Sequence, residues 1–257
     1  MPQDPARKID SVETSLAIVE YLRTNGPSRI SDIAQTIERS MSTTHVHLQT
    51  LLDHDYVVQE NERYALGLAF LRDGGQRRQR LNIYRAGKRE VRQLAEETKE
   101  ASHLAVEQGG RRVILYKTET GDAVYDNTPT GEFTQMHWTA TGKAILSHFP
   151  SDRITQIIDD HGLPRATDHT ITEKEDLLDH LAGIVDRGYA IEREERRSGV
   201  VAVAFPIFDT SSDTVVAAVS VSGPRQRILT ADHDIEPGII DSLSNRANVI
   251  ELRYNHY

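Results

Sequence analysis

Short hydrogen-bonding side chains recur in the stretch SMSTTHVHLQTLLDHDYV, residues 40–57. Ser42, Thr43 and Gln49 can exchange hydrogen bonds with the edges of DNA bases, and Val46 can pack against a thymine methyl group. Such neutral side chains enter a major groove without charge repulsion, whereas a solvated helix face usually carries Glu and Lys. The pattern therefore predicts a helix that reads bases. The candidate contacts from this helix are Ser40, Ser42, Thr43, His45, Val46, His47 and Gln49.

The base-reading stretch contains no Lys or Arg, so contacts with phosphates must come from its neighbours. Base contacts and phosphate contacts are separate tasks in DNA recognition. Arg29, Arg39 and Arg63 flank the stretch and are candidate phosphate ligands, and Ser31 is a further candidate DNA contact. Because these cations are few, we expect the affinity for DNA to depend only weakly on salt and to require a dimer.

A second candidate site is the stretch MHWTATGKAILSHF, residues 136–149. A P-loop would need Gly five residues before the Gly-Lys pair and Ser or Thr after the Lys, but His137 and Ala144 occupy those positions. The stretch instead predicts a loop that enters a helix, with Thr139 and Thr141 as candidate caps. Free backbone N–H groups at the start of a helix favour an anion.

Two further polar stretches allow two interpretations each. The charged run Glu192–Arg197 ends in Ser198-Gly199, and such a run alone is typical of a solvated face. The two serines of VSVSGP, Ser220 and Ser222, point to the same side of a predicted strand. They form either an exposed face or the floor of a small polar pocket.

No pattern typical of catalysis or of metal binding appears in the chain. It has no cysteine, no H-E-x-x-H and no G-x-S-x-G motif. His45 and His47 are two residues apart on a predicted helix, so they point to different faces and cannot chelate together. No histidine can be paired with Ser220 or Ser222 from the sequence. We therefore expect no catalytic residue, no metal site and no cofactor.

The composition is that of an acidic protein with no membrane-spanning segment. The 257 residues have a formal net charge of -9 and include no run of about 18 apolar residues and no signal peptide. We therefore expect a cytoplasmic location. The acid excess with only six lysines is compatible with the high-salt cytoplasm of a halophilic archaeon, and equally with an ordinary acidic protein. Residues 1–80 are nearly neutral, with ten basic and eleven acidic residues, which favours a nucleic-acid module fused to a different one.

Residues 11–24 predict a first helix that supports the base-reading helix. Val12, Leu16 and Val19 form an apolar stripe at helical spacing, and Ser11 is a candidate N-cap.

A short second helix over residues 30–37, with Ser31 as its candidate cap, precedes the base-reading helix. Residues 56–66 then predict a hairpin that turns at Asn61-Glu62. Residues 1–66 therefore predict a winged helix-turn-helix DNA-binding domain. The alternative is a small helical module for protein–protein contacts.

Residues 67–85 predict a linker helix, which Gly74-Gly75 should interrupt. Its arginines lie either near phosphates or on a solvated face.

Residues 86–257 predict an α+β domain around a mainly antiparallel sheet. The expected helices lie over 86–99, 140–148, 152–160, 173–187 and 238–254. The expected strands lie over 105–106, 112–116, 123–125, 189–191, 200–208 and 215–221.

The order and spacing of these segments resemble the IclR family of transcription regulators. The resemblance covers residues 8–253 and lies in KIDSVETSLAIVEYL, ISDIAQTI, the base-reading stretch, YALGLAFL, MHxxxxGKAIL, E-x-E-E-x-x-x-G and S-x-S-G-P. It implies an N-terminal winged helix-turn-helix and a GAF-like effector-binding domain. It also implies a dimer, or a dimer of dimers, that binds double-stranded operator DNA, and a linker helix that helps the dimer to form.

The resemblance further implies a pocket for a small organic or sugar acid. The ligand carboxylate would meet the backbone of Ala140 and Thr141, and Glu192 would be the acidic pocket residue. Ala202 stands where the family can have Cys, and Trp138 is larger than the residue often found there, so the size and identity of the ligand stay open. The implied effector contacts are Thr139, Ala140, Thr141, Gly142, Glu192, Gly199, Ala202, Ser220 and Ser222.

We thus expect a ligand-responsive regulator of an operon for sugar or organic acid catabolism. The alternative is a GAF-like small-molecule sensor that acts through protein contacts without sequence-specific DNA binding. Removal of residues 1–66 distinguishes them, because a pure sensor would keep its activity.

Overall fold

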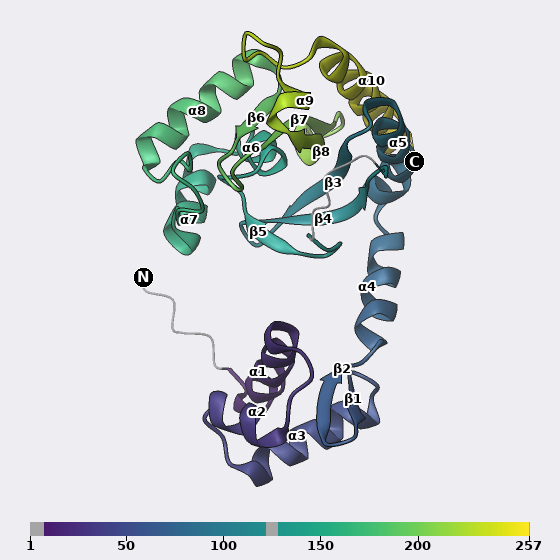
Figure 1. Cartoon of the computed structure of the whole chain (residues 1–257), viewed down its shortest axis with the longest axis vertical. Helices are drawn as coiled ribbons and strands as arrows, with labels where there is room; N and C mark the ends of the chain where they lie inside the picture. Colours follow the sequence, from purple (N-terminus) through teal and green to yellow (C-terminus); the bar gives the residue numbers. More distant parts are fainter. Residues whose placement is uncertain (1–7, 122–127, 257) are drawn as a thin grey trace. The chain divides into compact units, whose positions relative to one another are not determined.

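The computed structural model describes residues 8–121 and 128–256 of the chain, which fall into two compact units, 1–77 and 78–257 (Figure 1). The strand expected over 123–125 lies outside the described residues. Within the described residues, no helix is both long and apolar enough to cross a membrane.

The N-terminal unit is a winged helix-turn-helix, as the sequence predicts. Strands β1 and β2 pair as an antiparallel hairpin that turns at Asn61, which has a φ of 57°, a left-handed conformation that Asn tolerates. The elements are α1 (Asp10–Asn25), α2 (Ile30–Thr36), α3 (Met41–Asp53), β1 (Val57–Glu60), β2 (Arg63–Leu66) and α4 (Ala69–Gln79).

The apolar stripe predicted for α1 is not the face that packs. Ile18 and Leu22 enter the small core of the unit, whereas Val12 and Leu16 are 51% and 61% exposed. The residues of α1 that pack in the core are therefore not the predicted ones. Val12 and Leu16 instead form an exposed apolar face on α1.

Both predicted caps in this unit are wrong. Helix α1 begins one residue before Ser11, with Ile9 at its N-cap, and α2 begins at Ile30. Ser31 therefore lies inside the first turn of α2, where its hydroxyl donates to Asp32 Oδ1 at 3.0 Å.

The interruption predicted at Gly74-Gly75 is also wrong, because α4 runs through both glycines to Gln79. Apart from the adjacent residues and the backbone of the helix itself, no described atom lies within 4 Å of a Cβ built at either glycine, so nothing else crowds the helix there. The helical run ends after Gln79, and α5 begins at Asn82.

The C-terminal unit is α+β, with one antiparallel sheet in the order β5-β4-β3-β8-β7-β6. Its strands are β3 (Ala101–Gln108), β4 (Arg111–Thr118), β5 (Phe133–Gln135), β6 (Ala190–Arg193), β7 (Val200–Asp209) and β8 (Thr214–Pro224). Its helices are α5 (Asn82–Thr98), α6 (Ala140–Leu146), α7 (Ser151–His161), α8 (Lys174–Arg187), α9 (Arg225–Ile228) and α10 (Pro237–Asn255).

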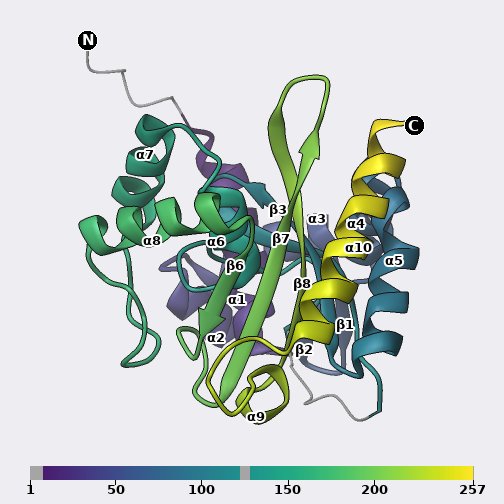
Figure 2. The ribbon, with the colours of Figure 1, turned by 90° about the horizontal axis from the view of Figure 1, so that it is seen from above.

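The two faces of this sheet differ because its strands alternate in side-chain size. Branched residues such as Val203 and Val219 pack under α5 and α10. Small residues such as Ala204 and Ala218 face α6, α7 and α8, and Figure 2 shows the two helix layers on opposite sides of the sheet. Alanines let α6 approach the sheet closely, so all seven residues of α6 are buried.

Candidate functional site

Helix α3 presents a stripe of exposed side chains at helical spacing. Ser42, His45, Val46 and Gln49 follow the i, i+3, i+4, i+7 pattern and are all exposed, with Val46 at 62%. The opposite face buries Leu48 in the core of the unit. The outward face of α3 is therefore neutral and rich in hydrogen-bonding groups, as a base-reading helix requires.

The other three predicted contacts of α3 have partners within the chain. The Oγ of Ser40 caps the helix by accepting from Thr43 N at 3.0 Å, and the hydroxyls of Ser40 and Thr43 lie 2.8 Å apart. His47 is half-buried, and its Nδ1 lies 2.8 Å from Ser15 Oγ of α1. His47 thus belongs to the packing between α1 and α3 rather than to the outward stripe.

The three arginines predicted to contact phosphates are exposed, but each already binds an oxygen atom within the chain. Arg29 pairs with Glu62 at 3.1 Å, and Arg39 pairs with Asp10. Arg63 donates to the carbonyl oxygen of Pro27 at 3.0 Å. A phosphate would therefore have to compete with these intramolecular contacts.

In the C-terminal unit, strand register brings three predicted effector contacts into one row. Glu192 of β6 lies opposite Ala202 of β7, which lies opposite Ser222 of β8. In the neighbouring row, Ser220 of β8 lies opposite His103 of β3. Because directly paired residues share a face, all five side chains lie on the side of the sheet that α6 covers.

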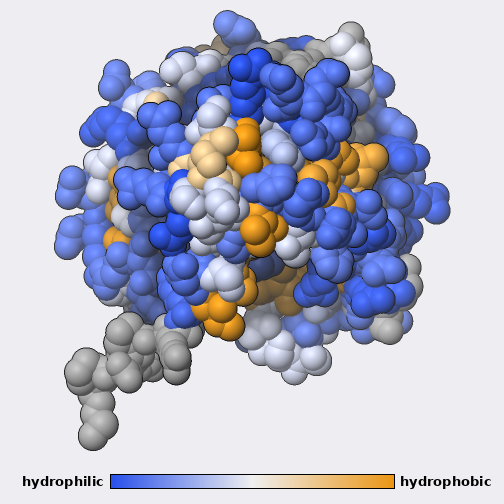
Figure 3. Space-filling view, turned by 90° about the horizontal axis from the view of Figure 1, so that it is seen from below, coloured by the Kyte–Doolittle hydropathy of each residue, from blue (hydrophilic) through white to orange (hydrophobic). Residues whose placement is uncertain are grey.

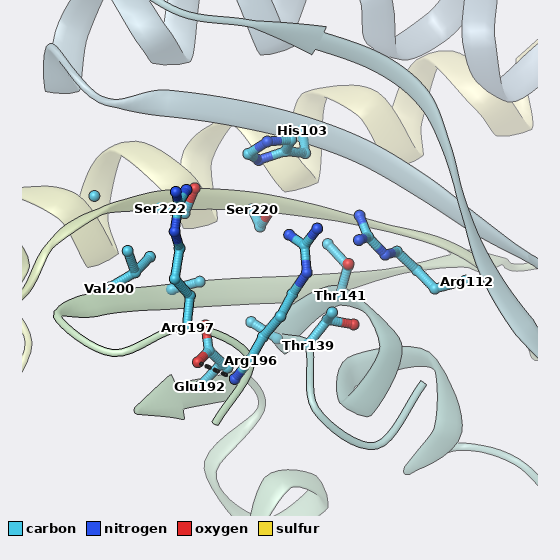
Figure 4. Close-up of a pocket in the computed structure, with 13 residues that line it drawn as sticks. His103, Arg112, Thr139, Thr141, Glu192, Arg196, Arg197, Val200, Ser220 and Ser222 are labelled. Carbon is cyan, nitrogen blue, oxygen red and sulfur yellow. Dashed lines mark hydrogen bonds between the residues drawn. The ribbon is translucent and has the colours of Figure 1, made fainter. Parts of the chain in front are cut away.

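The start of α6 meets this row and completes a cavity of about 210 Å³ (Figure 4). Thr139 is the N-cap, and its Oγ1 accepts from Gly142 N at 3.1 Å. Seven of the nine predicted contacts line the cavity: Thr139, Ala140, Thr141, Glu192, Ala202, Ser220 and Ser222.

Two predicted contacts, Gly142 and Gly199, do not line the cavity. A Cβ at Gly142 would lie 2.3 Å from the carbonyl oxygen of Met136, so this glycine allows α6 to pack against the preceding loop. Gly199 is exposed in the turn before β7, and its N–H donates to Glu194 Oε2 at 2.8 Å. Trp138 is not among the lining residues either; its Nε1 donates to Thr134 at 3.0 Å.

The sequence interpretation missed the basic residues of the cavity. Arg112 of β4 and Arg196 and Arg197 of the turn between β6 and β7 line it, as does His103. Arg196 and Arg197 belong to the charged run that resembled a solvated face. Side chains alternate along a strand, so the sequence predicts that Arg112 and Val113 point to opposite faces of the sheet. It does not predict which of the two faces lines a cavity.

Glu192 is the acidic group of the cavity and is 4% exposed. Its Oε1 accepts from the backbone N–H groups of Glu195 at 2.7 Å and Arg196 at 3.2 Å. Burial raises the pKa of Glu192 to about 7, although these hydrogen bonds oppose the shift. At neutral pH a substantial fraction of this carboxyl is therefore protonated and can donate a hydrogen bond.

Lys143 and Glu195 form a buried ion pair behind the cavity. Lys143 is fully buried within α6, and Glu195 lies in the turn between β6 and β7. Burial lowers the pKa of Lys143, and the charge of Glu195 opposes that shift. The pair ties α6 to the turn that carries Arg196 and Arg197.

In the described part of the chain, no three His, Asp or Glu side chains gather where they could hold a metal ion. His103 lies opposite Ser220 in the pairing of β3 with β8. The cavity therefore offers cationic groups, hydroxyls and one partly neutral carboxyl, which is a set suited to binding an anion.

Comparisons with known proteins agree with both units. Residues 11–61 match the protein-family model for the IclR helix-turn-helix domain, and residues 76–250 match the model described as bacterial transcriptional regulator IclR C-terminal. The chain is 28% identical to the probable HTH-type transcriptional regulator ArcR of Halobacterium salinarum, over 96% of this chain and 94% of that protein.

Solved structures share the architecture. The Thermotoga maritima IclR structure is 26% identical, with a TM-score of 0.77 over 96% of this chain and 100% of that chain. An IclR homologue from Microbacterium hydrocarbonoxydans, solved in complex with 4-hydroxybenzoate, has a TM-score of 0.82 over 96% of this chain and 100% of its own. At 19% identity, the latter bears on the fold alone.

Proposed function

Because the chain belongs to the IclR family of DNA-binding transcriptional regulators, we propose that it responds to a small organic or sugar acid and controls an operon for the catabolism of such compounds. The effector would bind in the cavity between α6 and the sheet. DNA would be bound by the winged helix-turn-helix.

The observation that carries the effector proposal is the composition of the cavity. Hydroxyls of Ser220 and Ser222 and guanidinium groups of three arginines line one concave space. Guanidinium groups bind carboxylates through two parallel hydrogen bonds.

The exposed stripe of α3 supports the role in reading bases. Ser42, His45 and Gln49 are the contacts we propose for base edges, and Val46 is the contact for a thymine methyl group. Arg29, Arg39 and Arg63 would meet phosphates after leaving their present partners.

A homodimer is part of the proposal, because apolar side chains of the N-terminal unit lack cover within the chain. Val12 and Leu16 of α1 are more than half exposed, and Leu68 and Leu71 are 78% and 69% exposed. The space-filling view from below shows exposed hydrophobic residues on a surface that is otherwise mostly hydrophilic (Figure 3). A second copy would bury such groups and place two α3 helices against two operator half-sites.

Effector binding would act by shifting populations. If the cavity binds its ligand more tightly in one arrangement of the two DNA-binding units, the ligand favours that arrangement in proportion to the difference in affinity. Helix α4 would transmit this change, since it joins the two units.

An electrophoretic mobility shift tests the DNA proposal, with DNA from upstream of the gene for this chain and scrambled DNA as control. We expect the upstream DNA to be retarded even when scrambled DNA is added as a competitor. Equal retardation of both DNAs at every salt concentration would refute sequence-specific binding by this chain.

A thermal-shift screen of sugar acids and 2-oxo acids tests the effector proposal. We expect at least one acid to raise the melting temperature and to bind more weakly to Ser220→Ala/Ser222→Ala. An unchanged affinity in that variant would show that the acid binds elsewhere.

A further inference from the structure

We propose that the effector is a dianion whose two acidic groups lie at opposite ends of the cavity, one beside the start of α6 and the other beside Arg197. This inference rests on the proposed acid effector and specifies its class. A short dicarboxylate, or a sugar acid with a second anionic group, would meet the requirement.

The first end is formed by Arg112 and Arg196. Their guanidinium groups extend toward each other beside Thr141 (Figure 4). Arg112 is 3% exposed, and Arg196 also donates to Thr128 Oγ1 at 2.6 Å. Because a guanidinium has five N–H donors, each can hold protein partners and a ligand carboxylate together. Two like charges that face one cavity favour an anion between them.

The second end is formed by Arg197 and Ser222. Arg197 is exposed, it lines the cavity together with Ser222, and its side chain extends toward Ser222 in the view of Figure 4. Ser220 lies two residues deeper along β8, so the two hydroxyls are separated by about 7 Å on one face of the strand. An acid that contacts both hydroxyls therefore has a backbone of a few carbons.

The charges of the cavity favour two anionic groups over one. Among residues 8–121 and 128–256, Glu192 is the acidic residue that lines the cavity, and its raised pKa leaves it partly neutral at pH 7. Of the acidic residues close by, Glu195 is paired with Lys143, and Glu132 lies 3.8 Å from Arg196. A monoanion at the α6 end would leave the charge of Arg197 without a ligand partner, whereas a dianion would engage both ends.

Calorimetric titration of the full chain tests the proposal with matched acids, namely butanoate and pentanoate against succinate and glutarate. We expect a dicarboxylate to bind at least about tenfold more tightly than the monocarboxylate of the same length. Arg197→Gln should weaken the dicarboxylate at least about tenfold and the monocarboxylate less than twofold. Arg197 is exposed, so the variant should fold, which thermal unfolding checks.

Arg193→Gln is the matched control, because Arg193 is exposed, does not line the cavity and donates to the carbonyl oxygen of His233. It should leave all affinities unchanged. Equal affinity for the paired acids, or an equal loss for both in Arg197→Gln, would overturn the dianion while leaving an acid effector in place. If none of the four acids binds, the dianion proposal is overturned, whereas the thermal-shift screen of sugar acids and 2-oxo acids decides the acid effector.

Discussion

The ammonium group of Lys143 and the carboxylate of Glu195 are joined in an ion pair from which water is excluded, 52 positions apart in the chain. The same Glu195 donates its backbone N–H to Glu192, and its carbonyl oxygen accepts from the hydroxyl of Thr170 at 2.6 Å. The pair therefore holds the turn that supplies Arg196 and Arg197 to the cavity.

Lys143→Met should destabilise the chain by about 3–5 kcal/mol, because it leaves the carboxylate of Glu195 buried without its partner. Lys143→Met/Glu195→Leu should recover much of this loss, since an apolar pair of similar size removes both buried charges. Urea unfolding at pH 7 measures the effect. Lys174→Met, at the half-exposed start of α8, is the control and should change stability by less than about 0.5 kcal/mol. A loss below about 1 kcal/mol in Lys143→Met would contradict the structural role.

Glu192→Gln should make stability less dependent on pH. The folded pKa of Glu192, about 7, is above its ordinary value of 4.5, so the unfolded chain releases this proton first as the pH rises. The wild-type fold should therefore lose up to about 3 kcal/mol between pH 4.5 and 7, at about 1.4 kcal/mol per pKa unit.

Glutamine keeps an oxygen for the two backbone N–H groups and cannot ionise. The variant should thus match the wild type near pH 4.5 and exceed its stability near pH 8, as measured by urea unfolding across this range. Parallel pH profiles would show that Glu192 ionises in the folded chain as it does in water.

Much of this architecture could be predicted, because periodicity and turn residues determine local structure. The hairpin at Asn61, the loop before α6 and the paired serines of β8 follow from the sequence alone. The apolar stripe of α1 was misjudged since Val12 and Leu16 fit helical spacing as well as Ile18 and Leu22 do. The spacing of apolar residues identifies an apolar face of a helix, but it does not show whether another element of the same unit packs against that face.

The basic half of the cavity could not be predicted for a similar reason. Arg196 and Arg197 lie in a charged turn that would look the same on a solvated surface. Only strand register places this turn beside Ser222, and register depends on pairing between β6, β7 and β8. Strand β5 was missed because three residues are too few to show alternation.

Ser42→Ala/Gln49→Ala should lower the affinity for operator DNA at least about tenfold, because each lost base contact costs about 1–3 kcal/mol. Affinity for unrelated DNA should not change, since neither residue is charged. Fluorescence anisotropy with both DNAs measures the difference. Gln226→Ala, exposed on α9, is the control. Equal losses on both DNAs would mean that these side chains do not read bases.

Val12→Glu/Leu16→Glu should disrupt the proposed dimer of DNA-binding units and with it operator binding. Both side chains are exposed within the chain, so the monomer fold should tolerate them. Sedimentation and circular dichroism measure assembly and folding, and anisotropy measures DNA affinity. Val185→Glu, on α8 and 49% exposed, should keep operator affinity. A doubly substituted chain that still binds the operator as tightly as the wild type would exclude α1 from the interface.

The ion pairs of Arg29 with Glu62 and of Arg39 with Asp10 have a consequence for how the protein searches a genome. In the proposed complex, DNA phosphates would have to displace two carboxylates before they contact these two arginines, so Glu62 and Asp10 would compete with phosphate. On an operator, the base contacts proposed for α3 would offset that displacement. On unrelated DNA they would be missing, so we expect faster dissociation and fewer copies held on the wrong DNA.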